Sequence, residues 1–310
     1  MTNNIVALVN NHELDEYHQL FEERNWPNAN ISFDPADIPQ ANILYGEPDL
    51  IIPHFPAAEK LVWIQSTWAG VEPFLKPEVR KDYTLTNARG IFGRTIAEYT
   101  LTYILAHERN LFAHAESQTR QAWEPILTGR LRDKTLGIVG VGSIGAVVAQ
   151  LFKGLGLTVL GYTRSSQNSA DVDQYFHPPS GLIEMAAACD YILNVMPSTP
   201  ASTNLLNASI FKAMRPTALL INAGRGTAIV DDDLIAALKD GEIAGAVLDV
   251  FREEPLPADH PYWTAPNCVV TPHMAAPSYP EDVLPIFHAN YLRFVESRPL
   301  KYVVDFEKGY

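Results

Sequence analysis

Cysteine is scarce in this chain. Only two cysteines occur among its 310 residues, Cys189 and Cys268, and they lie far apart and form no CxxC pair. This spacing supports neither a disulfide scaffold nor a cysteine zinc site, and we predict no metal site. We expect both thiols to be small apolar side chains on or beside strands, in a protein of a reducing compartment.

Basic residues are also few. The sequence has 23 Lys and Arg residues against 36 Asp and Glu residues, which gives a net charge of −13 with neutral histidines. It contains no Lys/Arg-rich run and no basic amphipathic stretch. Because polyanions are bound by clustered Lys and Arg side chains, neither nucleic acid nor an anionic membrane surface is an expected partner.

Long apolar runs are missing as well. No run approaches the roughly 20 apolar residues that a membrane-spanning helix needs. The N-terminal stretch MTNNIVALV lacks the basic start and the long apolar core of a signal peptide. We therefore expect a soluble, cytoplasmic protein without a membrane partner.

The chain does contain a regular alternation of short apolar runs with helix-length segments, in a composition of 47% apolar residues. The first series of strand-like runs comprises Ile5 to Val9, ANILYG, KLVWIQS and DYTLTNA, and a long helix is expected from Arg94 to Leu111. The second series comprises LGIVG, LTVLGY, YILNVM, ALLINAG, GAVLDV and CVVTPH. This alternation predicts an α/β fold with parallel sheets, and the length predicts two domains of roughly 150 residues each.

A glycine pattern opens the second series. Residues 137–149 read LGIVGVGSIGAVV, which places the pattern G-x-G-x-x-G between a predicted strand and a predicted helix. The first glycine permits a tight turn, the second lets the backbone approach a pyrophosphate, and the third allows the helix to pack closely on the strand. We expect a dinucleotide to be bound at this helix N-terminus by Gly140, Gly142, Ser143, Ile144 and Gly145.

The end of the next predicted strand indicates which dinucleotide is bound. LTVLGY runs into Thr163, Arg164 and Ser165, and no acidic residue occurs between Gly145 and Asp171. A carboxylate at this point would accept hydrogen bonds from the ribose of NAD(H) but would repel a 2′-phosphate, which an arginine and hydroxyl groups can bind. We predict NADP(H) in preference to NAD(H).

Three further strand ends carry unusual residues. Arg225 lies in NAGRG after ALLIN, Glu254 follows GAVLDV, and His273 follows CVVT. Since the ligands of an open parallel sheet lie beyond the carboxyl ends of its strands, we expect these side chains to converge on one crevice. An arginine, a carboxylate and a histidine together suit the binding and protonation of a 2-keto acid.

Several segments, in the same order, are similar to one family. GVGSIG, NAGRG, LDVFREEPLP and TPHMAA resemble the D-2-hydroxyacid dehydrogenase family over most of residues 60–275. The Thr-Arg-Ser strand end, the HMAAP segment and the terminal Lys308-Gly309-Tyr310 resemble its glyoxylate/hydroxypyruvate reductase A branch. With the strand pattern, this implies a Rossmann-type doubly wound parallel sheet domain for NADP, residues 94–275. It is inserted in a smaller flavodoxin-like α/β substrate domain, residues 1–93 and 276–310.

The resemblance also implies a role for each site residue. Arg225 would bind the substrate carboxylate and polarise the keto oxygen, because its planar fork suits both tasks. His273 would donate a proton to that oxygen during reduction, and Glu254 would hydrogen-bond the other imidazole nitrogen and favour the protonated ring. The further cofactor contacts implied in this half of the chain are Pro197, Thr199, Ala223, Gly224, Arg225, Asp249 and His273.

In the first domain, the segment after LVWIQ resembles the family loop whose backbone N–H groups bind the carboxylate. The substrate-binding residues implied there are Trp68, Ala69 and Gly70, and the two small residues allow a close approach of the main chain. Family members usually carry an aspartate where this chain has Glu72. A homodimer is also implied, with the helix of residues 94–111 as an interface element.

The sequence thus predicts an NADP-dependent oxidoreductase that reduces a small 2-keto acid of the glyoxylate or hydroxypyruvate type to the D-2-hydroxy acid. Closure of the two domains would exclude water from the reaction. One alternative is a dinucleotide-sensing, corepressor-like binding protein of the same fold, although an intact set of arginine, glutamate and histidine favours chemistry. Another is an NAD-dependent D-2-hydroxyacid dehydrogenase with a bulkier substrate.

Overall fold

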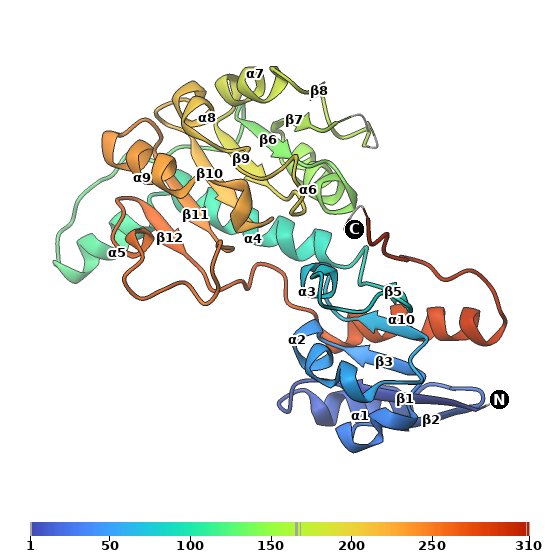
Figure 1. Ribbon diagram of the computed structural model, residues 1–310. Helices are drawn as coiled ribbons and strands as arrows, with labels where there is room; N and C mark the ends of the chain where they lie inside the picture. The colour runs from blue at the N-terminus through green and yellow to red at the C-terminus, as the bar shows by residue number, and fades with distance from the viewer. Residues whose placement is uncertain (1, 165–166, 168, 308, 310) are drawn as a thin grey trace. The chain divides into compact units, whose positions relative to one another are not determined.

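The computed structural model describes residues 2–164, 167, 169–307 and 309. The chain divides into two compact units, one formed by Met1–Ile91 and Ser278–Tyr310 and the other by Phe92–Pro277 (Figure 1). The domain boundaries expected from the sequence, 93/94 and 275/276, lie two residues from the observed 91/92 and 277/278. The chain therefore leaves the first unit, forms the second, and returns.

The first unit is built on a parallel sheet with the strand order β2-β1-β3-β4-β5, which is the flavodoxin-like order. Its strands are β1 (Asn3–Leu8), β2 (Ala29–Ser32), β3 (Ile43–Gly46), β4 (Trp63–Ser66) and β5 (Thr84–Thr86). Its helices are α1 (Leu14–Glu22), η1 (Pro35–Gln40), α2 (Pro48–Ile51), η2 (Ile52–Ala57), α3 (Glu72–Leu75) and α10 (Pro280–Val295).

Two different cores cover the faces of this first sheet. One consists of aliphatic side chains, among them Leu44 and Ile64, packed with the short helices. On the other face, Phe287 of α10 packs on Tyr45 of β3 and Trp63 of β4, with ring centroids 4.8 and 5.1 Å apart. Aromatic burial of this kind accounts for the return of the chain, because α10 completes the core of the first unit.

The second unit is built on a parallel sheet with the order β12-β11-β10-β9-β6-β7-β8. Its strands are β6 (Thr135–Val139), β7 (Thr158–Tyr162), β8 (Gln174–Phe176), β9 (Tyr191–Asn194), β10 (Leu219–Asn222), β11 (Gly245–Leu248) and β12 (Cys268–Val270). Its helices are α4 (Phe92–Glu108), α5 (Leu111–Thr119), α6 (Ser143–Gly154), α7 (Gly181–Ala188), α8 (Ala208–Ala213), η3 (Gly226–Ala228), α9 (Asp231–Asp240) and η4 (Pro261–Trp263).

This order confirms the predicted fold class. The sequence of strands runs outward from β6 to β8 on one side and from β9 to β12 on the other, as in a Rossmann-type doubly wound sheet. Successive strand residues point to opposite faces: Leu136 and Ile138 pack with α4 and α6, whereas Val139 packs with helices α7 to α9. Ligands of such a sheet bind beyond the carboxyl ends of the strands, near the switch between β6 and β9.

The helix expected from Arg94 to Leu111 is shorter in the structure. α4 ends at Glu108, Asn110 adopts a left-handed conformation with φ 51°, and α5 begins at Leu111. Asparagine tolerates this conformation better than most residues, so the chain turns between two helices where one was expected. None of the helices in the described part of the chain combines the length and the apolar content that a bilayer crossing requires.

Candidate active site

The glycine turn joins β6 to α6. Gly140 has φ +104°, a conformation that favours glycine, and its N–H donates to the Tyr162 carbonyl at 3.0 Å. A Cβ on Gly145 would lie 2.4 Å from the carbonyl oxygen of Gly140, so α6 packs on the strand end more closely than a side chain allows. A Cβ on Gly142 would meet no described atom within 4 Å. Open space therefore adjoins the first turn of α6, whose N–H groups suit a phosphate.

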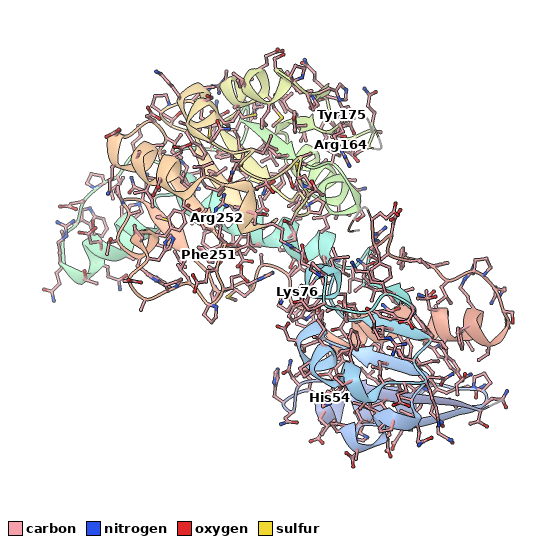
Figure 2. All side chains as sticks on the ribbon, in the orientation of Figure 1. His54, Lys76, Arg164, Tyr175, Phe251 and Arg252 are labelled. Carbon is pink, nitrogen blue, oxygen red and sulfur yellow. The ribbon has the colours of Figure 1, made fainter. Side chains whose placement is uncertain are left out.

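The residues expected to select the dinucleotide follow β7. Thr163 is buried, and its N–H donates to the Phe176 carbonyl at 3.1 Å while its own carbonyl accepts from His177 Nδ1 at 2.8 Å. Arg164 is exposed beyond this strand end (Figure 2). Ser165, the third predicted residue, lies outside the described residues. The structure thus offers a firmly held backbone that presents an exposed guanidinium group, which suits a phosphate ligand.

The loop after β9 lies between the glycine turn after β6 and the loop after β10. A Cβ on Gly140 would lie 2.9 Å from Met196 Cγ, and a Cβ on Gly224 would lie 2.9 Å from the backbone nitrogen and oxygen of Met196. Met196 therefore touches the glycine turn on one side and the loop after β10 on the other. Pro197 and Thr199, both predicted to contact the cofactor, belong to this same loop.

Arg225 lies on a loop that two fully buried asparagines hold. Asn194 Nδ2 donates to Asn222 Oδ1 at 2.8 Å, and the same oxygen accepts from the Gly224 N–H at 3.2 Å. Asn222 Nδ2 donates to the Arg225 carbonyl at 3.1 Å, and Arg225 Nη1 donates to the Gly224 carbonyl at 2.7 Å. Ala223 and Gly224, predicted cofactor contacts, are therefore part of a rigid turn beyond β10.

His273 and Glu254 are in direct contact. His273 Nδ1 lies 2.7 Å from Glu254 Oε2, and the other carboxylate oxygen accepts from the Phe251 N–H at 2.8 Å. The hydrogen bond to Glu254 raises the pKa of His273 above its usual value, although burial alone would lower it. Burial raises the pKa of the Glu254 carboxyl, but the hydrogen bonds from His273 and Phe251 outweigh it and bring that pKa below its usual value. The pair therefore favours a protonated imidazole whose Nε2 is the nitrogen left for a substrate.

Arg225 shares the electrostatic environment of this pair. Its positive charge lowers the pKa of His273 and that of Glu254. The structure thus brings together the three residues that the sequence singled out, although they lie on three separate strand ends. A guanidinium group close enough to act on a protonated imidazole can bind a carboxylate, while the imidazole donates a proton.

Asp249 binds the backbone of the turn that carries His273. Its carboxylate is fully buried and accepts from the Thr271 hydroxyl at 2.6 Å and from the N–H groups of Met274 and Ala275, both at 2.9 Å. Its carbonyl accepts from the His273 N–H at 2.9 Å, which holds His273 at φ 50°. The described contacts therefore make Asp249 the anchor of the turn that carries His273, a task that the sequence did not reveal.

The predicted substrate loop follows β4 in the first unit. The carbonyls of Thr67, Trp68 and Ala69 accept from Ser278 Oγ at 2.9 Å, the Ala88 N–H at 3.1 Å and Asn87 Nδ2 at 2.7 Å, respectively. Because each trans peptide carries its N–H opposite its carbonyl, these bonds also fix the direction of the N–H groups of Ala69 and Gly70. That these groups bind the substrate stays a prediction from the sequence.

The polar residues that support the site were not among the predicted site residues. Asn194 and Asn222 are the last residues of otherwise apolar strands, Thr271 directly follows β12, and all three are buried. Tyr99 of α4 shares a hydrogen bond of 2.7 Å with Thr271 Oγ1. A polar residue at the carboxyl end of a buried strand was the available signal, because a buried polar side chain requires a partner.

The fold and the site define a nicotinamide-dinucleotide-dependent oxidoreductase with two units. Residues 101–275 match the family model of the D-isomer specific 2-hydroxyacid dehydrogenase NAD binding domain. Over 95% of its length, the chain is 31% identical to a glyoxylate/hydroxypyruvate reductase A of Serratia proteamaculans, of which it covers 98%. The chain belongs to the D-isomer specific 2-hydroxyacid dehydrogenase family.

Two solved structures extend this comparison. A D-isomer specific 2-hydroxyacid dehydrogenase family protein from Aeromonas salmonicida is 40% identical, with a TM-score of 0.93 over 99% of this chain and 100% of that one. An NADPH-dependent glyoxylate/hydroxypyruvate reductase from Sinorhizobium meliloti, solved with NADP and sulfate, is 26% identical, with a TM-score of 0.87 over the whole of both chains.

Proposed function

We propose that the protein reduces a small 2-keto acid, of the glyoxylate or hydroxypyruvate type, to the D-2-hydroxy acid with NADPH. The observation that carries the proposal is the contact of 2.7 Å between His273 and Glu254, with Arg225 in the same electrostatic environment. A 2-keto acid has a carboxylate beside a carbonyl, and this site offers a cation for the first and a proton for the second. The reductases similar to the chain support this substrate class.

The residues around the glycine turn fit a dinucleotide. The open space at Gly142 and the N-terminus of α6 would receive the pyrophosphate, and Met196 and Ala223 lie at the neighbouring strand ends. When bound, the dinucleotide supplies a hydride for the carbonyl carbon of the substrate. The chain itself supplies binding, orientation and the proton.

In the proposed reaction, Arg225 binds the substrate carboxylate in a planar fork and polarises the adjacent keto oxygen. His273 donates the proton on Nε2 to that oxygen, which becomes the hydroxyl of the product. Glu254 keeps the ring oriented through Nδ1 and stabilises its positive charge before transfer. In the oxidation direction, the neutral His273 takes the proton back.

We infer a preference for NADPH from the end of β7. An exposed Arg164 after the buried Thr163 suits a 2′-phosphate, and no carboxylate occurs at the strand end to repel it. The Sinorhizobium meliloti relative with NADP supports this choice, as does a D-isomer specific 2-hydroxyacid dehydrogenase from Xanthobacter autotrophicus solved with NADPH.

We also infer a homodimer. The second unit exposes apolar side chains on and after α5, with Trp123 99% and Leu127 95% exposed and Leu111 and Phe112 more than half exposed. Large exposed apolar side chains close together in the chain are typical of an interface with another protein. A second copy is the partner that family resemblance implies.

The test of the proposed function is a substrate panel. Purified protein is incubated with NADPH or NADH and with glyoxylate, hydroxypyruvate, pyruvate or phenylpyruvate, and oxidation of the cofactor is followed by absorbance. We expect the highest kcat/KM with NADPH and either glyoxylate or hydroxypyruvate. Absence of turnover with every keto acid would overturn the proposed enzymatic function and favour a dinucleotide-sensing protein.

A further inference from the structure

Arg252 follows β11, next to Phe251 (Figure 2), and its side chain contacts the loop after β10. Its Nη2 donates to the Ile229 carbonyl and to Asn204 Oδ1, and lies 3.3 Å from the Thr227 carbonyl. Its Nε lies 3.5 Å from Asp231 Oδ2 at the start of α9. One guanidinium group therefore binds several acceptors on the segment that immediately follows Arg225.

The backbone next to Arg252 also contacts the loop that carries Arg225. A Cβ on Gly226 would lie 2.0 Å from the carbonyl carbon of Phe251, so the two segments are packed backbone to backbone. The N–H of Phe251 donates to Glu254, which in turn binds His273. The residue after Phe251 is thus placed to link the loop of Arg225 to the segment that holds the histidine.

We propose that Arg252 is a positioning residue that fixes the distance between Arg225 and the His273–Glu254 pair. The inference rests on the proposed function, which gives Arg225 and His273 their tasks. Arg252 acts through the two backbone segments that it joins rather than on the substrate. Catalysis of this kind depends on geometry, because a displacement of about 1 Å can cost on the order of a hundredfold in rate.

The arrangement of the acceptors suits an arginine at this position. A guanidinium group carries five N–H donors in a rigid planar fork, whereas a lysine ammonium carries three donors on one flexible nitrogen and reaches a less extended set of acceptors. The charge is balanced by Asp231, whose other oxygen accepts from the Tyr262 hydroxyl at 2.9 Å. Arg252 is therefore held in turn by Asp231 of α9, which is itself held by Tyr262 of η4.

A surface pocket gives this inference an unusual test. A pocket of about 380 Å³ is lined in part by Asn204, Asp231, Arg252 and His260. Truncation of Arg252 to alanine would widen this pocket next to the carbonyls that have lost their donor. A guanidinium ion from solution can then enter and bind the same acceptors.

The first experiment needs no substrate. The imidazole of His273 is titrated by NMR in the protein without added ligand, and is assigned by the signal lost in His273→Asn. The charged groups that act on this ring are Glu254, Arg225 and Asp249. If Arg252→Ala loosens the contact with Glu254, the pKa of His273 falls, by about half a unit or more. Simple removal of a nearby positive charge would raise that pKa, so the sign separates positioning from a direct charge effect.

The second experiment measures reduction of hydroxypyruvate by NADPH. We expect Arg252→Ala to lower kcat/KM by on the order of tenfold to a hundredfold, Arg252→Lys to recover only part of it, and guanidinium chloride at millimolar concentration to restore activity to the alanine variant alone. The matched control is Arg215→Ala, because Arg215 pairs with Asp190 at the opposite, amino edge of the sheet, 3.1 Å away. It should leave the pKa of His273 and kcat/KM unchanged.

The outcomes separate this inference from the proposed function. If the wild-type protein turns over no keto acid, the proposed function fails, and the titration of His273 still decides the role of Arg252. If the pKa of His273 is unchanged or raised in Arg252→Ala, and kcat/KM stays within twofold of wild type, Arg252 does not position the site. An equal loss of activity in Arg215→Ala would also overturn the inference, because it would show a general effect of removing an arginine ion pair.

Discussion

The proton on His273 is controlled by one carboxylate. Glu254 accepts from Nδ1 and is itself fixed by the Phe251 N–H, so the ring keeps one orientation and an elevated pKa. In the proposed reaction, reduction requires the protonated ring of His273. The rate of reduction should therefore be highest below the pKa of His273 and should fall as the pH rises through it.

Replacement of this carboxylate tests the sign of the effect. Glu254→Gln keeps the shape of the side chain but removes the charge that stabilises the imidazolium. We expect the falling limb of kcat/KM for keto acid reduction to move to lower pH by about one unit, together with a lower maximal rate. Glu253→Gln, at the exposed neighbouring carboxylate, is the control and should keep the wild-type profile. A limb that stays in place in Glu254→Gln would contradict the role of Glu254.

We expect the choice of dinucleotide to depend on a second single residue, Arg164. Arg164→Asp places a carboxylate where the 2′-phosphate of NADPH is expected, so we predict that the ratio of kcat/KM for NADPH over NADH falls by at least about tenfold. The measurement compares both cofactors at saturating hydroxypyruvate. The control is Arg298→Asp, at an exposed arginine of the first unit. It makes the same change of charge and should leave the ratio unaltered. An unchanged ratio in Arg164→Asp would exclude the phosphate role.

At the scale of single residues, the sequence predicted the site where the proposed function requires a rare combination of side chains. Arg225, Glu254 and His273 follow three strands, and a shared sheet edge was enough to predict their proximity. The tasks of Asp249 and Arg252 could not be predicted, because both act on backbone groups of segments far away in the chain. Such partners are known only once the fold has brought the segments together.

Among the elements, the turn from β6 to α6 separates two roles of glycine. A methyl group on Gly145 would clash with the Gly140 carbonyl, whereas one on Gly142 would meet no described atom within 4 Å. We predict that Gly145→Ala lowers the stability of the second unit by about 2 kcal/mol. Gly142→Ala should leave the Tm within about 2 °C of wild type and raise the KM for NADPH severalfold, because only the ligand needs that space.

Thermal unfolding and the KM for NADPH are measured on both variants. Each variant serves as the control for the other, since the substitution is the same and the positions are three residues apart. If Gly142→Ala unfolds as early as Gly145→Ala, the space beside it has a structural task. If Gly142→Ala binds NADPH as tightly as wild type, the pyrophosphate lies elsewhere.

The elements that the sequence did not predict are short or lie at an edge. β2 and β8 are the outer strands at one end of each sheet, have four and three residues, and are only partly buried, so they lack the compact apolar run of a central strand. α5 was missed because its residues follow α4 without a glycine or proline between them. The central strands were predictable because burial on both faces selects continuous apolar sequences.

Across the whole molecule, a net charge of −13 coexists with the proposed binding of two anions. Long polyanions would meet the charge of the entire surface, whereas a dinucleotide and a small carboxylate meet only a few nearby groups. Arg164, Arg225 and the N-terminus of α6 supply those groups in the second unit. The acidic composition therefore argues against nucleic acid as a partner but is compatible with small anionic ligands.

Assembly is the other property of the whole molecule that can be tested. We predict that the protein is a dimer by light scattering after gel filtration, and that the double substitution Trp123→Ser and Leu127→Ser shifts it toward the monomer. Both side chains are almost completely exposed in the single chain, and their burial in an interface is worth about 1.5–3 kcal/mol each. Trp263→Ser, at a half-exposed tryptophan elsewhere in the second unit, is the control. A monomeric wild-type protein would refute the dimer.

The central claim is that His273 donates the proton when a 2-keto acid is reduced. The most direct measurement compares wild type with His273→Asn in the oxidation of NADPH by hydroxypyruvate, with the affinity for NADPH determined separately by fluorescence titration. We predict that kcat falls by at least about a hundredfold while the Kd for NADPH stays within about threefold of wild type. A variant that retains the wild-type kcat would contradict the claim and remove His273 as the proton donor.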